Sequence, residues 1–221
     1  MLETYIIRIN RNLSEHEYQQ LQIWISPEKR LKLKQYFHFI DAQHTLLGDI
    51  LVRKLIHKHF YIKNNEIIFD TNAYGKPFLK NHLGFHYNIS HAGNYVVCVV
   101  GDKPVGIDVE IYETVNLKTA EIIADRFFTD DETEYIFSQT GIRRKRAFLQ
   151  IWTMKESYIK HNGKGLNIPL RSFSVLCEFD ICFHHIFENG EAISHICTDL
   201  GKEQPSVFEL TVSDLLLMYN N

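Results

Sequence analysis

Two acidic segments about fifty residues apart, 106–110 and 152–160, place the tightest constraint on how this chain can fold. In the first, aliphatic residues alternate with Asp108 and Glu110, which predicts a strand with both carboxylates on one face and the apolar side chains on the other. In the second, Glu156 continues a row of aromatic residues spaced by four, so on a helix this acid belongs to a row that begins in the core. The fold must therefore give Glu156 a partner.

The three carboxylates together suggest a divalent-metal site. Hard cations take oxygen ligands, and Mg²⁺ usually combines a few carboxylates with waters and substrate phosphates. Asp108, Glu110 and Glu156 suit that role. The alternative for the strand pair is a solvent-facing row of acids, and the alternative for Glu156 is a surface ion pair with Lys160 worth about 0.3–0.5 kcal/mol. The aromatic row argues against full exposure of Glu156.

Composition and charge narrow the classes of function. With 221 residues, of which 45% are hydrophobic, the chain can form one large domain or two smaller ones with a sizeable core. The net charge is −3, so no overall positive field would hold the chain on nucleic acid or on an anionic membrane. The N-terminus lacks a basic stretch followed by an apolar one, and no apolar run approaches the roughly 20 residues of a membrane span. We therefore expect a cytoplasmic protein that binds neither nucleic acid nor membrane.

Cysteine and histidine spacing gives no sign of a transition-metal site. The four cysteines show no Cys-x-x-Cys spacing and lie in apolar, strand-like contexts, which predicts reduced core thiols. The twelve histidines include no His-Glu-x-x-His motif, so we expect no zinc site.

The first half predicts helices followed by short strands. Ser26 and Pro27 provide an N-cap and a first-turn proline for a short basic helix that ends near residue 36. A second helix is predicted from about Asp41, where leucine and isoleucine recur at helical spacing. Strands are predicted at 67–69, 85–89 and 95–100, with a turn at 72–77.

The second half begins after a break near mid-chain. Residues 101–104 (Gly-Asp-Lys-Pro) interrupt the pattern and mark a candidate boundary. Helices are predicted at 118–128, from a capping box that begins at Thr129, and at 143–160. Strand-like runs at 172–177, 181–187, 193–197 and 208–212 then complete an antiparallel sheet. The predicted fold class is α+β.

Several residues outside the acidic segments are candidates for phosphate contacts. Lys29 and Lys32 share one face of the basic helix, while Lys76 follows Gly75, which would let the backbone approach a ligand closely. His91 lies in a turn between two strands, where it could donate to a phosphate. The alternative for each lysine is a solvated surface charge, and for His91 an ordinary turn residue.

Seven segments together carry a resemblance that covers nearly the whole chain. They are 26–30 (Ser-Pro-Glu-Lys-Arg), 46–49 (Leu-Leu-Gly-Asp), 74–77 (Tyr-Gly-Lys-Pro), 88–91 (Asn-Ile-Ser-His), 106–110 (Gly-Ile-Asp-Val-Glu), 126–128 (Arg-Phe-Phe), and 152–160 with 163–166 (Gly-Lys-Gly-Leu). In this order they resemble the surfactin-type 4'-phosphopantetheinyl transferases, which move phosphopantetheine from coenzyme A to a serine of a carrier protein. The related acyl-carrier-synthase type is much shorter and trimerises, so chain length and Glu110 as a third acid favour the longer type.

The resemblance implies two similar α/β halves related by a pseudo-twofold axis, each with a small, mainly antiparallel sheet packed on helices. The N-terminal half, residues 1–102, would contact the nucleotide of coenzyme A. The C-terminal half, residues 103–221, would carry the magnesium site and the catalytic helix. A monomer is implied, with coenzyme A and Mg²⁺ in the cleft between the halves; Mn²⁺ is equally compatible because it accepts the same oxygen ligands.

The resemblance also assigns roles to individual residues. Asp108, Glu110 and Glu156 would bind the metal, and Glu156, Lys160 and Asp108 would be catalytic. Coenzyme A contacts would come from Lys29, Lys32, His44, Tyr74, Gly75, Lys76, Pro77, Ser90, His91, Lys155 and Lys160. Among them, Lys29, Lys32 and His91 would meet the 3'-phosphate, residues 74–77 with Ser90 the adenine side, and Lys160 the pyrophosphate. His44 stands where relatives usually have an arginine, and a histidine is mostly neutral at pH 7, which would make one phosphate contact weaker or pH-dependent.

The implied reaction transfers 4'-phosphopantetheine to a carrier domain of a peptide or acyl synthase and releases 3',5'-ADP. Glu156, directly or through water, would take the serine proton, and Lys160 would stabilise the departing nucleotide. Residues 112–125, next to the acidic strand, are the candidate carrier surface. Two alternatives stay open: another magnesium-dependent phosphoanhydride enzyme, such as a nucleotide hydrolase, and a non-catalytic module that binds nucleotide or carrier protein.

Overall fold

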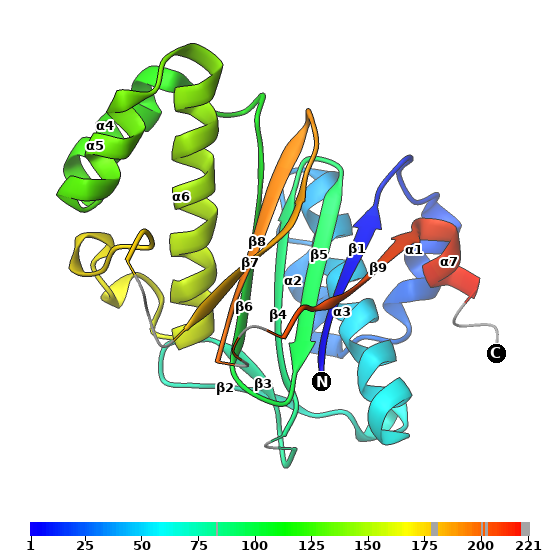
Figure 1. Ribbon diagram of the computed structural model, residues 1–221. Helices are drawn as coiled ribbons and strands as arrows, with labels where there is room; N and C mark the ends of the chain where they lie inside the picture. The colour runs from blue at the N-terminus through cyan, green and yellow to red at the C-terminus, as the bar shows by residue number, and fades with distance from the viewer. Residues whose placement is uncertain (83, 178–180, 200, 202, 218–221) are drawn as a thin grey trace.

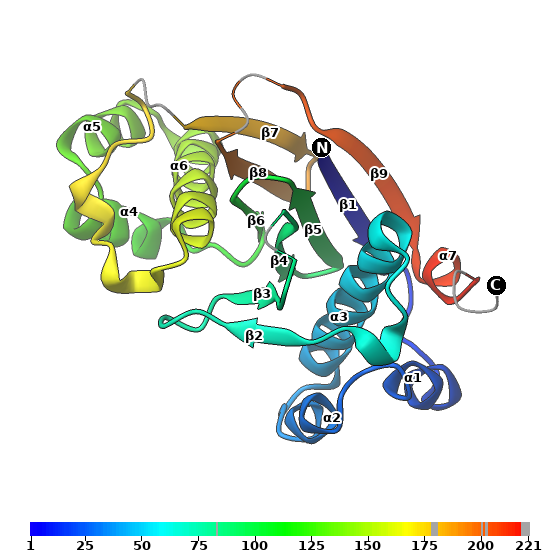
Figure 2. The same ribbon diagram turned by 90° about the horizontal axis from the view of Figure 1, so that it is seen from below.

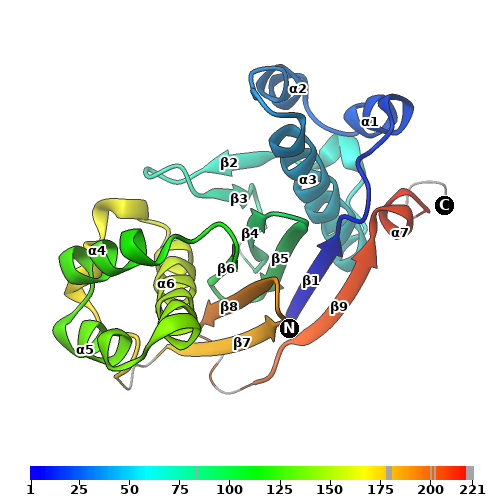
Figure 3. The ribbon, with the colours of Figure 1, turned by 90° about the horizontal axis from the view of Figure 1, so that it is seen from above.

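The computed structural model describes residues 1–82, 84–177, 181–199, 201 and 203–217. In these residues two small sheets form the middle of the molecule, and a group of helices lies on either side of them (Figure 1, Figure 3). The strands are β1 (Leu2–Arg8), β2 (Phe69–Thr71), β3 (Pro77–Leu79), β4 (His86–Ala92), β5 (Tyr95–Gly101), β6 (Val105–Ile111), β7 (Cys182–Glu188), β8 (Ala192–Thr198) and β9 (Ser206–Thr211). The α-helices are α1 (Glu15–Gln22), α2 (Pro27–Leu33), α3 (Phe39–Phe60), α4 (Leu117–Phe127), α5 (Asp130–Ser138), α6 (Gly141–Asn162) and α7 (Val212–Leu217), and single 3₁₀ turns are η1 (Asn64–Glu66), η2 (Gly165–Asn167) and η3 (Leu170–Ser172).

The first sheet has the strand order β4-β5-β1-β9. β5 runs antiparallel to β4 and to β1, whereas β9 runs parallel to β1. The 22-residue helix α3 packs on this sheet and buries Leu46, Leu47 and Ile50 completely. Gly48 lets the helix approach β4 closely, because a Cβ there would lie 3.1 Å from the Ile89 side chain. The leucine and isoleucine residues that recur at helical spacing therefore form the face that joins α3 to the sheet.

The second sheet repeats this plan. Its strand order is β6-β8-β7 with antiparallel pairing throughout, and the 22-residue helix α6 packs across β6 and β8. α4 and α5 cover the other side of α6 (Figure 2). Each half thus combines one long helix with one small sheet, and the predicted α+β fold class is confirmed.

The two halves share a core where β4 and β5 meet β6. The backbone N–H of Ile107 donates to the Asn88 side-chain oxygen over 2.9 Å, so the strands are joined through a side chain. Val97 and Val99 from β5 pack with Val105 and Ile107 from β6, and all four are completely buried. This contact sets the distance between residues of β4 and the acids of β6.

Local capping follows the sequence prediction. The Ser26 hydroxyl accepts the Lys29 N–H over 3.2 Å, and Pro27 occupies the first turn of α2. Thr129 and Glu132 form the predicted capping box at the start of α5. These local signals specify where α2 and α5 begin because they act within four residues.

The position of the C-terminal strand corrects a prediction. Residues 208–212 were expected to complete the antiparallel sheet of the second half, but β9 joins the first sheet and runs parallel to β1. The Phe208 ring stacks on Tyr5 with centroids 4.9 Å apart, and α7 buries Val212 and Leu215 in the core of the first half. The division at residues 102 and 103 stays a prediction, but residues 206–217 pack with the N-terminal half.

Three further predictions were wrong. His91 was expected in a turn but lies within β4 (His86–Ala92). Residues 172–177 form no strand, because carbonyls at Leu170 and Phe173 accept bonds from a buried lysine side chain instead of a neighbouring strand. All four cysteines are free, as predicted, but Cys98 and Cys197 alone are buried, and Cys177 is exposed. The strand β1 and the helix α1 were not predicted.

Candidate active site

The centre of the site is a contact among three elements. Asp108 of β6, Ser90 of β4 and Lys160 of α6 meet where the two halves join. The Lys160 ammonium donates to Asp108 Oδ1 over 2.6 Å and to Ser90 Oγ over 2.9 Å, and Ser90 donates to the same carboxylate oxygen over 3.0 Å. The structure therefore brings together three of the residues predicted for catalysis or coenzyme A binding.

Gly106 permits this arrangement because β6 and α6 touch through their backbones. A Cβ at Gly106 would lie 2.0 Å from the Ser157 carbonyl oxygen and 2.3 Å from the His161 nitrogen. Real side-chain atoms do not approach that closely, so only glycine lets the strand lie directly against the last turns of the helix. The close approach places Asp108 within reach of Lys160.

Glu110 lies two residues further along the same strand face. Its Oε1 accepts a hydrogen bond from the Trp152 indole N–H over 3.0 Å. Burial, followed by the nearby Asp108 carboxylate, raises the pKa of Glu110 to about 7, against the opposing effect of Trp152 and Lys160. A carboxyl with this pKa exchanges its proton near neutral pH, and a bound cation would favour its ionised form.

Glu156 is half-buried on α6, one turn before Lys160. Burial and the negative charge of Asp108 raise its pKa, while Lys160 lowers it. Its carboxylate interacts electrostatically with both of those groups, so the three acids share one electrostatic environment. Lys160, one turn further along the helix, pairs with Asp108 over 2.6 Å, and Glu156 lies in the electrostatic field of both groups.

The acids fit a hard divalent cation in their chemistry. Asp108 is 4% exposed, and its Oδ2 is buried without a hydrogen-bond partner. Carboxylate oxygens that raise one another's pKa are the donors that Mg²⁺ or Mn²⁺ favours. Within the described ranges, however, no three histidine, cysteine or acidic side chains already stand close enough together to hold a metal ion. The donor set is present, with one oxygen of Asp108 held by Lys160 and one of Glu110 held by Trp152.

The two histidines of the predicted phosphate region lie side by side, with their ring planes tilted by 30°. The rings of His44 and His91 have centroids 4.9 Å apart, and His91 is exposed. His44 is 3% exposed, and its Nε2 lies 2.9 Å from the Gly93 carbonyl oxygen. Because a carbonyl only accepts, Nε2 carries the proton. Burial, aided by His91, lowers the pKa of His44 to about 4.

This geometry corrects the expectation for His44. A buried, neutral imidazole that already donates to Gly93 cannot replace an arginine cation at a phosphate. His44 instead lies behind His91, the exposed member of the pair. The role of His91 at a 3'-phosphate stays a prediction.

Lys29 and Lys32 differ in their surroundings. The Lys29 ammonium lies 2.9 Å from Asp49 Oδ2, and the other oxygen of Asp49 accepts from Arg53 over 2.6 Å. Asp49 is buried and was not predicted to take part; its place in the Leu-Leu-Gly-Asp segment was the available signal. Lys32 is exposed on the same helix. Asp49 thus fixes where Lys29 lies, whereas Lys32 is open to solvent.

The turn between β2 and β3 presents its residues in two directions. Tyr74 is 54% exposed, and Gly75 and Pro77 are also exposed. Gly75 has a φ of +87° with no atom near a would-be Cβ, so the turn needs glycine for its backbone alone. The Lys76 side chain points the other way, into the protein, where its ammonium donates to the Val105 and His161 carbonyls.

Lys155 lies outside the cluster, contrary to the prediction that it contacts coenzyme A. It is completely buried, and its ammonium lies 2.8 Å from Glu132 Oε2. It also donates to the carbonyls of Leu170 and Phe173 over 2.7 and 2.6 Å. Three acceptors use the three protons of an ammonium, so none is left for a ligand. Lys155 joins α6 to α5 and to residues 170–173.

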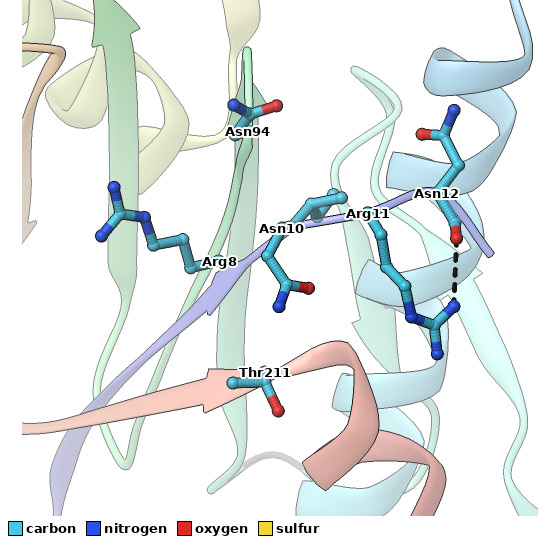
Figure 4. A pocket seen from close by; sticks show the side chains of 7 residues that line it. Arg8, Asn10, Arg11, Asn12, Asn94 and Thr211 are labelled. Carbon is cyan, nitrogen blue, oxygen red and sulfur yellow. Dashed lines mark hydrogen bonds between the residues drawn. The ribbon is translucent and has the colours of Figure 1, made fainter.

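One pocket of the molecule lies elsewhere. A cavity of about 580 Å³ opens beyond the end of β1, next to Asn94 and Thr211 (Figure 4). Its two arginines are paired, Arg8 with Glu191 over 3.4 Å and Arg11 with Glu17 over 2.7 Å. None of the predicted site residues lines it, so we place the functional site at the acids and not here.

A second pocket borders the acids. It has a volume of about 250 Å³ and is lined by Glu110, Val115, Ile123, Phe148 and Trp152 among others. Its walls come from β6, α4, α6 and the loop before α4, which begins the predicted carrier surface. The pocket therefore connects the acidic strand to that surface.

Fold and site together define an α+β protein of two joined halves. At their junction lies a group of residues that we call the acid–lysine cluster, namely Asp108, Glu110, Glu156 and Lys160. Family models for known proteins match both halves: the 4'-phosphopantetheinyl transferase superfamily over residues 104–209, and the N-terminal part of 4'-phosphopantetheinyl transferases over residues 12–102.

Individual relatives agree with the family models. The chain is 40% identical to the 4'-phosphopantetheinyl transferase Sfp of Bacillus subtilis, over 79% of this chain and 76% of that protein. It is 36% identical to the 4'-phosphopantetheinyl transferase gsp of Aneurinibacillus migulanus, over 78% and 70%. It is also 30% identical to human L-aminoadipate-semialdehyde dehydrogenase-phosphopantetheinyl transferase, over 71% and 53%. The chain belongs to the 4'-phosphopantetheinyl transferase family and is an enzyme of that type.

The structure also bears on the predicted absence of membrane segments. Among the helices that it describes, none combines the length and the apolar composition needed to cross a membrane.

Proposed function

We propose that this enzyme transfers 4'-phosphopantetheine from coenzyme A to a serine of a carrier protein domain and releases 3',5'-ADP in a magnesium-dependent reaction. The observation that supports this most is the contact of Ser90, Asp108 and Lys160 beside Glu110 and Glu156. Three carboxyl groups and one ammonium meet there in a partly buried junction, which suits transfer of a charged phosphoryl group. We propose that it acts as a monomer on a peptide or acyl synthase.

Asp108, Glu110 and Glu156 would hold the metal ion. A bound Mg²⁺ would supply charge neutralisation at the pyrophosphate, which favours departure of the nucleotide. Asp108 Oδ2, which has no hydrogen-bond partner, could take this role without breaking the contact to Lys160.

Glu156 is the proposed general base. Its raised pKa makes this carboxylate a stronger base, which favours accepting a proton during the reaction. Glu156 takes the proton of the carrier serine, and the serine oxygen forms a bond to the phosphorus of the phosphopantetheine group. The bond from that phosphorus to the bridging oxygen breaks, and the electron pair leaves with 3',5'-ADP beside the Lys160 ammonium.

The N-terminal half would hold the nucleotide. Lys32 and His91 are exposed and open to a 3'-phosphate, and Asp49 orients Lys29 toward the same role. The exposed side of the turn at Tyr74 would receive the adenine. Binding of this kind positions the pyrophosphate near the acids, which is the main contribution a protein makes to phosphoryl transfer.

The carrier would dock on the surface that begins beside Glu110. Ile122 of α4 is 53% exposed, whereas Val115 and Ile123 are half-buried and line the pocket next to the acids. An apolar side chain of the carrier could fill that pocket while its serine faces Glu156. Exchanging Ile122 for Asp should raise the KM for the carrier about tenfold and leave the KM for coenzyme A unchanged.

The direct test is intact-mass spectrometry of an apo peptidyl carrier domain incubated with the enzyme, coenzyme A and Mg²⁺. We expect a mass gain of one phosphopantetheine that EDTA abolishes. Glu156→Gln should slow transfer at least about a hundredfold with coenzyme A still bound, while Glu113→Gln, an exposed acid near the same strand, should transfer normally.

Other results would support the alternatives. Coenzyme A cleaved without a mass gain on the carrier would indicate a hydrolase. Coenzyme A bound without cleavage, with no effect of Mg²⁺ on melting temperature, would indicate a binding module. Near-normal turnover of Glu156→Gln would show that another group is the base.

A further inference from the structure

The inward-pointing Lys76 occupies an unusual place for a residue of an exposed turn. Its ammonium donates to the Val105 carbonyl and to the His161 carbonyl, both over 3.0 Å. His161 lies in the last turn of α6, where backbone carbonyls lack helical partners and carry partial negative charge. The lysine therefore joins the β2–β3 turn to the end of α6 and to the start of β6.

Asn72 makes a second connection from the other end of the same turn. Its side-chain nitrogen donates to the Gly163 carbonyl over 2.8 Å. Its side-chain oxygen accepts the N–H groups of Tyr74 and Lys76, both over 2.9 Å. One side chain thus shapes the turn and attaches it to the residue that caps α6.

Gly163 completes the contact. It has a φ of +74°, and a Cβ there would lie 2.8 Å from Lys76 Cδ and 3.1 Å from Asn72 Nδ2. The lysine stem therefore packs on the bare backbone of the helix cap. We call these interactions of Asn72 and Lys76 with Val105, His161 and Gly163 the turn–helix contact.

We infer that Lys76 and Asn72 are positioning residues that fix the exposed turn at Tyr74 relative to the catalytic helix, and that the Lys76 ammonium is not itself a phosphate ligand. This inference rests on the proposed function, which assigns the turn to the nucleotide. It replaces the expectation that Lys76 contacts coenzyme A through its charge. Figures 2 and 3 show the β2–β3 hairpin lying between α3 and α6.

The turn–helix contact lies next to residues of the acid–lysine cluster in the chain. His161 directly follows Lys160, and Val105 precedes Asp108 by three residues. The turn is thereby fixed to the two elements that carry the acid–lysine cluster, although residues 72 and 163 are 91 positions apart. A nucleotide bound at the turn would be held at a set distance from Asp108 and Lys160, which favours transfer because small misplacements of reacting groups slow it strongly.

The test compares wild type with Lys76→Met, which keeps an unbranched stem but removes the donors. In the ligand-free protein, hydrogen–deuterium exchange at residues 159–163 should speed up about tenfold, since the helix end loses its attachment. The KM for coenzyme A should rise about tenfold while the KM for the carrier stays unchanged. In the double variant Asn72→Ala, Lys76→Met, the KM for coenzyme A should rise far less than the product of the two single fold-changes, because both side chains act through one contact.

Two matched controls separate this role from general damage. Lys80→Met removes a lysine beside the same hairpin whose ammonium pairs with exposed Asp70, and it should change none of these values. Gly163→Ala should mimic Lys76→Met, whereas Gly141→Ala, at a φ of +54° with open space around it, introduces similar backbone strain without the clash. We expect wild-type KM values for Gly141→Ala.

The outcomes distinguish the inference from the proposed function. Unchanged exchange at residues 159–163 in Lys76→Met, or a strictly multiplicative double variant, would overturn the inference even in an enzyme that transfers normally. A wild type that neither binds coenzyme A nor modifies a carrier would overturn the proposed function, and faster exchange in Lys76→Met would then still support the turn–helix contact.

Discussion

Burial and partnering, more than residue type, decide what each titratable side chain can do here. The rings of His44 and His91 are neighbours, yet His44 is buried and donates its Nε2 proton to Gly93, whereas His91 is exposed. Lys155 and Lys160 lie on the same helix, yet one has three internal acceptors and the other reaches the acids. The family resemblance assigned all four residues to coenzyme A binding, so only the structure separates those that face the site from those that support it.

Buried histidine should make the fold sensitive to acid. The pKa of His44 is about 4 and that of His195 about 3, both lowered mainly by burial, whereas an unfolded chain binds the proton near pH 6.5. Because the unfolded state then holds more protons, the free energy of unfolding should fall as pH drops from about 6.5 to 4. His44→Gln, which keeps a donor for Gly93, should flatten this slope by up to about 1.4 kcal/mol per pH unit.

Urea denaturation at several pH values measures this slope. His16→Gln, at an exposed histidine of α1, serves as the control and should follow wild type. An unchanged slope in His44→Gln would mean that His44 is protonated in the folded protein.

Lys155 should behave as a structural residue. Lys155→Met leaves Glu132 buried without its counter-ion, and breaking a buried ion pair in this way costs about 3–5 kcal/mol of unfolding free energy. Adding Glu132→Gln to it should recover part of the loss. Denaturation curves measure the unfolding free energy, and calorimetry measures coenzyme A binding. Lys103→Met, at an exposed lysine, serves as the control. If Lys155→Met had normal stability but bound coenzyme A more weakly, Lys155 would be a coenzyme A ligand and not a structural residue.

Local sequence patterns predicted individual helices and strands, but they did not predict which elements pack or pair with one another. The cap at Ser26, the capping box at Thr129 and the alternation around Asp108 each act within a few residues, so the sequence alone was enough to predict α2, α5 and β6. Residues 172–177 show the limit of such patterns. Their apolar alternation resembles a strand, but Phe173 and Val175 fill the core beside α6 in an irregular conformation whose polar groups bond to Lys155 and Glu132.

The contact of β6 with α6 should be the least tolerant packing in the site. Gly106→Ala would place a methyl group against the Ser157 carbonyl and the His161 nitrogen, both of which belong to helix backbone that cannot rotate away. We expect a loss of about 3 kcal/mol or more in unfolding free energy, and slower transfer because Asp108 moves away from Lys160.

Gly190→Ala is the matched control, because a Cβ there meets no atom within 4 Å. Thermal melting and the carrier-modification assay together decide the matter. Wild-type melting of Gly106→Ala would contradict the backbone contact between β6 and α6.

At the scale of the molecule, the C-terminal strand β9 returns across the predicted division to pair with β1. The sequence indicated two halves because helix and strand patterns recur on either side of residues 101–104, and the structure repeats one plan twice. The sequence could not indicate that β9 pairs with β1, because this pairing joins residues some two hundred positions apart in the chain. The acid–lysine cluster was predictable in membership for Asp108, Glu110, Glu156 and Lys160, but the direction of Lys76 depends on the same long-range packing.

Removing the returning strand should therefore damage the half that lies farthest from it in sequence. A chain ending at residue 204 keeps every predicted site residue but loses β9 and α7, including Val212 and Leu215, which are completely buried in the first core. Exposing the edge of β1 and this part of the core should make the shortened protein unfold at lower temperature and lose cooperativity, with proteolysis beginning in residues 1–102. Leu215→Asp should produce a milder form of the same defect, because it buries a charge in that core, whereas Ser213→Asp on the exposed side of α7 should not. Limited proteolysis followed by mass spectrometry locates the first cuts. If the shortened chain melts like wild type and modifies the carrier at the same rate, the first half is stable without β9 and the division at residues 102 and 103 describes the folding units after all.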